Sequence, residues 1–424
     1  MKLVVVSPHF SPDLAPTGEV ITRVVEELAA RDHRIEVVTS LPWYREHKVE
    51  AGYEGRPWRY EDTPWGRITR IHPFPASDKR NLLKRGAAFA GFSALAGALG
   101  GRGGRVDGVL AVSPPLTLAA AGWAIAKKRR AAFVFNVQDV YPDVAIELGV
   151  LRSGRAIAAA HRVERWCYKR ADAVTVLSED LKRNVAHKTS EPDKVRLIPN
   201  FVDTEWITPG PKENAYRREF GLQGKFVVMY AGNVGLSQGL NAVVEAASAL
   251  AYEEQLVFVV NGQGAERDKL KRAARGLPNI RFVDVQPVGR LPEVLAAADL
   301  HLVTLKKGLA RTSVPSKTYS ILSAGRPLIA SVDTASEVAN AVERAGAGIA
   351  IPPEDPEALA KAVRRLMDAG SELDDMGARG RSFVEAWASP AAVAIAYEEL
   401  FKELLSLRSP RGARRAPKDP AARR

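Results

Sequence analysis

The 424-residue sequence contains a single cysteine, Cys167. One cysteine can form neither an internal disulfide nor a cysteine-based metal cluster, so a reducing compartment is the default expectation. No window reaches the roughly 18 to 20 uninterrupted apolar residues that a membrane-spanning helix needs. The apolar run at residues 3–6 is too short for a signal-peptide core and is typical of a buried first strand. We therefore expect a cytoplasmic chain that does not cross a bilayer.

The sequence has fewer acidic than basic residues: 49 Asp and Glu against 61 Lys and Arg, which gives a net charge of +12. Such an excess is typical of proteins that bind nucleic acid, an anionic membrane or phosphorylated substrates. The basic segment 406–424 has no interleaved aromatic residues, and no motif that reads nucleic acid occurs. We therefore expect no nucleic-acid partner and attribute the charge to phosphate and lipid.

Short apolar runs rich in β-branched residues alternate with helical patterns throughout the chain. The runs lie at residues 3–6, 35–39, 108–112, 132–136 and 173–177, and again at 226–231, 257–261, 280–283, 300–305 and 327–330. Near-continuous apolar strands separated by helices indicate parallel sheets that are covered on both faces. The sequence predicts an α/β protein with two doubly wound, Rossmann-like domains.

The length exceeds what one hydrophobic core usually serves, which favours two domains. A segment with three prolines, residues 199–211, follows the last strand and helix of the first half and is expected to link the domains. We expect an N-terminal, acceptor-side domain at 1–205 and a C-terminal, nucleotide-sugar-binding domain at 212–387. Helix 388–405 is expected to return to the first domain, and the basic tail 406–424 to be disordered.

Residues 79–101 combine a basic lead-in with an apolar stripe. Four basic residues open the segment, and no charge follows between residues 86 and 101. Such a helix suits the surface of an anionic membrane. An internal helix of the sheet domain, rich in Ala and Gly, is an equal alternative.

Glycine-rich turns occur where a strand hands over to a helix, where backbone N–H groups are free to bind phosphate. Gly18 occupies such a turn after the first strand, although a purely structural turn explains it as well. In the second half, YAGNVGLSQGL contains Asn233 and Gln238, and NGQG contains Gly262 and Gly264. None of these turns completes a P-loop or a dinucleotide fingerprint, which argues against NAD. A nucleotide diphosphate is the expected ligand.

Seven ordered motifs resemble the GT-B glycosyltransferases of family 4, and among them the bacterial fucosamine-type transferases of envelope polysaccharide synthesis. The motifs are PDLAPTGEV, VQDVYPD, IPNFVDTEWI, YAGNVGLSQGL, NGQGAERDKL, QPVGRLPEVLAAADLHLVTL and VPSKTYSILSAGRPLIA. The resemblance covers essentially the whole folded chain. It implies two Rossmann-like domains that face each other across a cleft.

The same resemblance implies transfer of a sugar from a nucleotide-diphosphate donor, with UDP-sugar favoured, to a lipid-linked or cell-envelope glycan acceptor. Such enzymes usually retain the anomeric configuration and need no metal, and the donor is a substrate, so no cofactor is expected. The reaction would take place in the cytoplasm at the inner face of the membrane. A nucleotide-sugar epimerase and a noncatalytic nucleotide-sugar binder are the alternatives.

The sequence departs from the family pattern at its charged positions. Asn233 and Gln238 stand where an Arg and a Lys usually follow the first strand of the second domain. Thr312 and Ser320 replace the usual pair of glutamates, so residue 320 cannot offer a carboxylate to the ribose. We expect Lys317 to supply the cation that meets the leaving phosphate. A solvated surface lysine is the alternative.

Further contacts to the donor and acceptor follow from the same comparison. The loop before Lys317 and the start of its helix offer Arg311, Ser313, Pro315, Ser316, Tyr319 and Ser320 as nucleotide or phosphate contacts. Tyr319 could instead belong to the core. Glu337 begins a helix and either caps it or binds a sugar or ribose hydroxyl. Asp139 follows a strand where family members often carry an acid near the transferred sugar, although it could simply form a turn. His9, alone after the first strand, is more simply structural.

Overall fold

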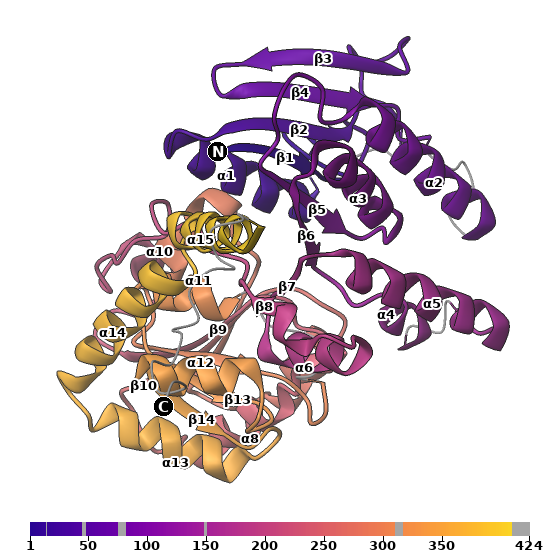
Figure 1. Ribbon diagram of the computed structural model, residues 1–424. Helices are drawn as coiled ribbons and strands as arrows, with labels where there is room; N and C mark the ends of the chain where they lie inside the picture. The colour runs from indigo at the N-terminus through magenta and orange to yellow at the C-terminus, as the bar shows by residue number, and fades with distance from the viewer. Residues whose placement is uncertain (14, 45–47, 75–81, 148–150, 310–316, 409–424) are drawn as a thin grey trace, which may run out of the picture. The chain divides into compact units, whose positions relative to one another are not determined.

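The computed structural model describes residues 1–13, 15–44, 48–74, 82–147, 151–309 and 317–408 (Figure 1). The chain forms two compact units, each built on its own sheet. Among the described residues, the first unit comprises Met1–Leu177, Leu181–Ile198 and 393–408, and the second comprises Ser178–Asp180 and Pro199–Ala392. Residues 199–205, which we expected to close the first domain, are thus grouped with the second unit.

The first unit contains an eight-stranded sheet in the order β3-β4-β2-β1-β5-β6-β7-β8. Its strands are β1 (Lys2–Val6), β2 (Arg34–Ser40), β3 (Trp58–Thr63), β4 (Gly66–Ile71), β5 (Gly108–Ser113), β6 (Ala132–Val137), β7 (Ala173–Val176) and β8 (Val195–Leu197). All neighbouring strands are parallel except β3, which pairs antiparallel with β4 at the edge. The predicted doubly wound parallel sheet is confirmed here, whereas the antiparallel edge was not predicted.

Helices cover both faces of this sheet. They are α1 (Pro16–Ala30), α2 (Leu82–Leu99), α3 (Thr117–Arg129), α4 (Asp143–Glu147), α5 (Gly154–Arg170) and α6 (Glu179–Lys188), with the short turn η1 (Pro192–Lys194). Val4 and Val6 of β1 share a core cluster with Phe92 of α2. Because side chains alternate along a strand, the intervening Val5 points to the opposite face, where it is also buried.

The apolar stripe of α2, for which a lipid-facing role and an internal role were equal alternatives, is buried within the first unit. Phe92, Ala96 and Leu99 are 3%, 0% and 6% exposed and belong to the core of the first unit. Side chains buried against the sheet cannot also enter a lipid surface, so the alternative of an internal helix describes this face. No helix in the described ranges is long and apolar enough to span a bilayer.

The second unit contains a six-stranded parallel sheet in the order β11-β10-β9-β12-β13-β14. Its strands are β9 (Phe226–Ala231), β10 (Leu256–Asn261), β11 (Ile280–Val283), β12 (Leu300–Thr304), β13 (Leu328–Ser331) and β14 (Gly348–Ile351). Strand order reverses between β9 and β12, which makes the carboxyl ends of these two strands a topological switch point. Open α/β sheets bind their ligands at such points.

Eight helices and two short 3-10 turns accompany this sheet in the described part of the second unit. The helices are α7 (Ala215–Glu219), α8 (Asn241–Ala249), α9 (Arg267–Ala273), α10 (Leu291–Ala296), α11 (Lys317–Ser323), α12 (Glu337–Ala345), α13 (Pro356–Met367) and α14 (Glu372–Trp387), and the turns are η2 (Leu236–Gln238) and η3 (Val288–Arg290).

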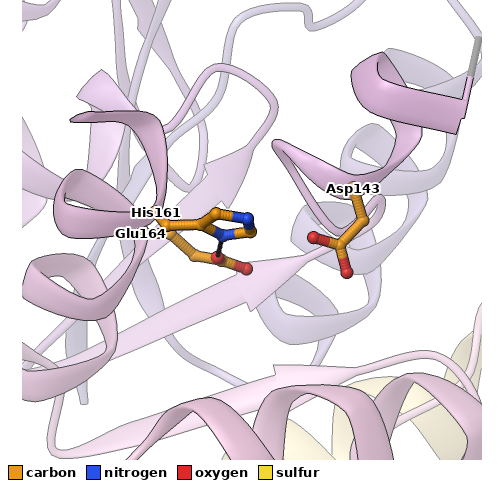
Figure 2. A group of neighbouring side chains, drawn as sticks. All are labelled: Asp143, His161 and Glu164. Carbon is orange, nitrogen blue, oxygen red and sulfur yellow. Dashed lines mark hydrogen bonds and ion pairs between the residues drawn. The ribbon is translucent and has the colours of Figure 1, made fainter. Parts of the chain in front are cut away.

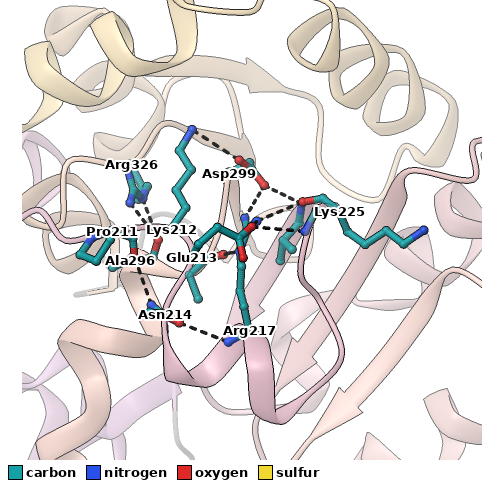
Figure 3. A network of polar contacts seen from close by, with 12 residues as sticks. Pro211, Lys212, Glu213, Asn214, Arg217, Lys225, Ala296, Asp299 and Arg326 are labelled. Carbon is teal, nitrogen blue, oxygen red and sulfur yellow. Dashed lines mark hydrogen bonds and ion pairs between the residues drawn. The ribbon is translucent and has the colours of Figure 1, made fainter.

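A buried polar network ties the segment before α7 to the sheet of the second unit (Figure 3). Arg217 of α7 is 3% exposed, and its guanidinium forms a 2.6 Å ion pair with Asp299, just before β12. Arg326 donates to the carbonyl oxygens of Gly210 and Ala296 at 2.6 and 2.9 Å. Each buried guanidinium is therefore satisfied by acceptors, as burial of a charge requires.

The C-terminal helix α15 (Pro390–Arg408) starts in the second unit and belongs to the first from Val393 onward. Asn136 of β6 donates to the Tyr397 hydroxyl at 3.0 Å, and both side chains are buried. Arg31, at the end of α1, forms a 2.5 Å ion pair with Glu398. A Cβ atom on Gly108 of β5 would lie 2.5 Å from the Phe401 ring, so the glycine makes room for it. The helix is thus an integral part of the first unit.

Candidate functional site

The turn after β9 lies at the switch point of the second sheet and contains two of the predicted contacts. The Tyr230 hydroxyl, at the end of β9, lies 2.6 Å from the Asn233 carbonyl oxygen and 3.2 Å from Oε1 of Gln238. The hydroxyl has a single proton, which the nearer Asn233 oxygen accepts or shares with the Gln238 oxygen, so the phenol contacts both ends of the turn. Tyr230 itself is fully buried, which makes it a rigid support. Sequence reasoning did not identify this tyrosine, because its position within β9 is that of an ordinary core residue.

The two glycines of NGQG bring the turn after β10 against the turn after β9. A Cβ atom on Gly262 would lie 1.9 Å from the Gly232 carbonyl oxygen, and one on Gly264 would lie 2.3 Å from that of Val234. Backbone hydrogen bonds join the turns, including Val234 N to Gln263 O at 2.8 Å. Close backbone approach therefore explains both glycines, and their contact with phosphate stays a prediction.

Lys317, the first residue of α11, extends its ammonium group to the β9 turn. Nζ lies 3.9 Å from the centre of the Tyr230 ring, and a Cβ atom on Gly232 would lie 3.3 Å from it. The atom is buried and has no hydrogen-bond partner among the described residues. This burial lowers the pKa of Lys317 to about 7. The alternative of a solvated surface lysine does not fit this environment.

The structure places the other predicted contacts around Lys317 only in part. Arg311, Ser313, Pro315 and Ser316 lie outside the described residues, as does Thr312. Ser320 is half-buried on α11, one turn from Lys317. Tyr319 is 7% exposed and packs in the core cluster that α11 forms with β12, β13 and α12.

Glu337 begins α12 but does not cap it. The cap is Ser336, whose Oγ accepts a hydrogen bond from the backbone N–H of Ala339 at 3.2 Å. The Glu337 side chain is 2% exposed, and burial raises the pKa of its carboxyl group. One oxygen of this carboxylate accepts a hydrogen bond from the backbone N–H of Glu179, the first residue of α6, at 3.2 Å. The sugar or ribose contact of Glu337 stays a prediction.

In the first unit, Asp139 follows β6 on the loop that leads to α4. The residue is exposed, yet the local loss of hydration still raises the pKa of its carboxyl group. No described residue forms a hydrogen bond or ion pair with this carboxylate. It is therefore available to a ligand hydroxyl, whereas Oδ2 of Asp143, four residues on, already accepts hydrogen bonds from Asn184 and Lys188.

Asp143, His161 and Glu164 are the residue types that bind metals, and their side chains point toward one another (Figure 2). Lys188 of α6 already bridges the two carboxylates, with Nζ at 2.7 Å from Asp143 and 2.9 Å from Glu164. Tyr168 also donates to Glu164 at 3.0 Å. The ammonium group of Lys188 thus lies where a metal ion would bind the two carboxylates. The cluster connects α4, α5 and α6.

The loop between β1 and α1 contains His9, which we expected to be structural, and Gly18 lies in the first turn of α1 rather than in the loop before it. His9 Nδ1 lies 2.6 Å from the carboxylate of Asp13, which is 1% exposed. A Cβ atom on Gly18 would lie 2.9 Å from that of His9, so this glycine leaves room for the pair. The spacing of four residues directly after a strand was the available signal. A phosphate contact at Gly18 stays a prediction.

Two family models match the chain. The glycosyl transferase 4-like domain covers residues 17–200, and glycosyl transferases group 1 covers residues 225–369. The putative colanic acid biosynthesis glycosyl transferase WcaI of Escherichia coli K12 is 29% identical across 87% of this chain and 92% of its own length. The probable glycosyltransferase WbjE of Pseudomonas aeruginosa is 32% identical across 71% of this chain and 75% of its own.

Solved structures agree on the fold. Sucrose-phosphate synthase from Thermosynechococcus elongatus aligns with a TM-score of 0.67 at 18% identity, across 96% of this chain and all of that one. HepE from Anabaena, solved in complex with UDP, aligns with a TM-score of 0.65 at 14% identity, across 95% of this chain and all of that one. The predicted fold and family are thereby confirmed: the chain belongs to the GT-B glycosyltransferases of family 4.

Proposed function

We propose that this glycosyltransferase moves a sugar from a nucleotide-diphosphate donor, with UDP-sugar as first candidate, to a lipid-linked or cell-envelope glycan acceptor. The observation that carries the donor assignment is the buried ammonium of Lys317 at the switch point of the second sheet, which has no hydrogen-bond partner in the described part of the chain. A relative named for colanic acid biosynthesis supports a role in envelope polysaccharide synthesis. A structural neighbour solved with UDP supports the choice of nucleotide.

The chemistry assigned to Lys317 is electrostatic. When the bond between the sugar and the diphosphate breaks, negative charge develops on the departing phosphate oxygens. A cation that is already positioned in a dry environment stabilises this charge without reorganising solvent. The π face of the Tyr230 ring attracts the ammonium but is no conventional acceptor, so the N–H bonds that point away from the ring can donate to a phosphate. Lys317 thereby replaces the cations that Asn233 and Gln238 do not provide.

On the first unit, we assign Asp139 to the acceptor or the transferred sugar. An exposed carboxylate with a raised pKa can accept a hydrogen bond from a hydroxyl group and orient its oxygen for attack. Retention of configuration and independence of metal ions are part of the proposal and rest on the family resemblance. The proposal also includes contact with an anionic membrane surface through the basic residues of segments 79–101 and 406–424.

Donor screening tests this function directly. The intact protein is titrated with UDP and GDP by calorimetry and then incubated with UDP-sugars and membrane extracts that contain lipid-linked glycans. We expect micromolar UDP binding and labelled glycolipid whose new anomeric proton, by NMR, matches the donor configuration, with EDTA without effect. Lys317→Ala should lower turnover at least a hundredfold. Isomerisation of the nucleotide sugar in the absence of an acceptor would indicate an epimerase. Binding of the donor without transfer of its sugar would indicate a noncatalytic binder.

A vesicle experiment tests the membrane contact separately. Vesicles of neutral lipid and vesicles with anionic lipid are sedimented with the intact protein and with a variant that lacks residues 406–424. We expect binding to anionic vesicles only, weakened by the truncation and by added salt. Equal binding of both proteins would remove the tail from the proposal.

A further inference from the structure

The loops after β1 and β2 join at a single buried carboxylate in the first unit. Asp13 accepts at one oxygen from the imidazole of His9, at 2.6 Å, and at the other from the backbone N–H of Tyr44, at 3.0 Å. In the strand order β2-β1-β5, the order of the strands along the chain reverses between β1 and β5, so β1 lies at the topological switch point of this sheet. The pair therefore lies at the carboxyl edge of the strands, at the position where ligands bind in this fold class.

The hydrogen bond to Asp13 determines what His9 can offer to a ligand. A carboxylate has no proton to give, so in the neutral imidazole it accepts the proton of Nδ1 and Nε2 keeps its lone pair. Within the described part of the chain, Nε2 has no hydrogen-bond partner, and 14% of the His9 side chain is exposed. An imidazole held in this tautomer accepts a hydrogen bond from a hydroxyl group.

Aromatic rings surround this acceptor. The Trp43 ring lies 5.8 Å from that of His9 and is inclined to it by 25°, and the Tyr44 ring meets His9 edge-on at 5.2 Å. Tyr44 is 41% exposed. The loop beneath is fixed from both sides, because Ser7 donates to the His9 carbonyl oxygen and Ser40 to that of Pro8, each at 2.7 Å.

We infer that His9, Trp43 and Tyr44 form a subsite for a pyranose ring of the acceptor, positioned by Asp13. A pyranose has an apolar C–H face that packs on aromatic rings and hydroxyl groups that bond to a fixed acceptor. A phosphate fits less well, because the Asp13 carboxylate would repel it. This inference rests on the proposed function and adds to it the class of group that the first unit recognises.

Saturation-transfer difference NMR on the intact protein tests the subsite. The probes are the methyl glycosides of glucose, galactose, mannose and N-acetylglucosamine at millimolar concentration, with saturating UDP. We expect wild-type protein to transfer saturation to at least one glycoside, and His9→Gln, Trp43→Ala and Tyr44→Ala to reduce the signal at least fivefold. Trp58→Ala and His187→Ala are the matched controls, because both side chains are exposed elsewhere in the first unit, and they should keep the signal.

Thermal unfolding and UDP calorimetry accompany each variant. If His9→Gln or Trp43→Ala fails to fold, Tyr44→Ala decides, since removal of an exposed ring leaves the core unchanged. A wild-type protein that saturates no glycoside, or three variants with undiminished signal, would overturn the subsite. Loss of saturation on the UDP base in these variants would assign the rings to the nucleotide and also overturn it. Absence of UDP binding to wild type contradicts the donor assignment instead.

Discussion

The Nζ atom of Lys317 lies 3.9 Å from the centre of the Tyr230 ring. The ring attracts a cation through its π face but offers no hydrogen-bond acceptor there, and burial lowers the pKa of the amine to about 7. Near neutral pH the unliganded protein therefore contains both the charged and the neutral lysine. A phosphate bound beside Nζ would favour the charged form, which links donor binding to a proton.

We predict that UDP binding takes up a proton between about pH 7.5 and 9. Above its pKa in the free protein the Lys317 amine is neutral, and the bound diphosphate restores the charge. The affinity should fall by up to about tenfold per pH unit in this range. Calorimetry in buffers of different ionisation enthalpy measures the uptake. Lys317→Met should abolish it and Lys271→Ala, on the exposed side of α9, should not; uptake that persists in Lys317→Met would refute the assignment.

Without ligand, Lys317→Met should stabilise the protein by about 1 to 3 kcal/mol at pH 7, because it removes a buried polar group that has no hydrogen-bond partner among the described residues. The sign of the pH dependence follows from the pKa of this lysine, which is about 7 in the folded protein against an ordinary value of 10.5. Between these pH values the unfolded chain binds more protons than the folded protein, so the free energy of unfolding of the wild type rises with pH. The difference in this free energy between Lys317→Met and the wild type therefore narrows. Chemical denaturation at pH 7 and pH 9.5 measures both free energies of unfolding. A variant that is less stable at both pH values would contradict the environment described.

Gly262→Ala should destabilise the protein by about 2 to 4 kcal/mol, because its Cβ would meet the Gly232 carbonyl oxygen at 1.9 Å. The turn after β9 must then move, and UDP binding should weaken with it. Gly289→Ala is the matched control, since a Cβ there meets nothing within 4 Å. Urea denaturation of both variants makes the comparison. Equal midpoints would show that the two turns are not packed as described.

Glu398→Gln should weaken the packing of α15 in the first unit. Hydrogen bonds from Lys402 and Arg31 lower the pKa of the Glu398 carboxyl group to about 2, below its usual value of 4.5. This stabilisation is fully present above pH 4.5 and disappears as the pH falls through 2. We expect a loss of about 1 to 2 kcal/mol at pH 7 that shrinks toward pH 2, measured by thermal unfolding. Glu403→Gln, in an exposed pair with Arg196, should cost less than half as much.

The sequence predicted the two parallel sheets because their strands are apolar runs bounded by turn residues, a pattern that depends only on local burial. It also pointed to Lys317, because the cations usual in the family are missing at Asn233 and Gln238 and a proline precedes the lysine just before a helix; the contact of Lys317 with phosphate stays a prediction. It did not predict Tyr230, because its position within β9 is that of an ordinary core residue. It missed the pairing of His9 with Asp13, although the two lie four residues apart in one loop. The contact of Asp13 with Tyr44 could not be predicted, because it joins two loops whose proximity follows from strand order. It could not decide whether the apolar stripe of α2 faces lipid or the interior of the sheet domain, because an apolar face has the same pattern whether a sheet or a membrane covers it.

The route of the chain through α15 governs the order in which the protein can fold during its synthesis. Tyr397 and Phe401 complete the interior around Asn136 and Gly108, yet the ribosome makes them only after every strand of the second sheet. Domains generally fold as they emerge, amino-terminal ones first. Here the core of the first unit is incomplete until α15 has been made, whereas the sheet of the second unit already has all its strands by then.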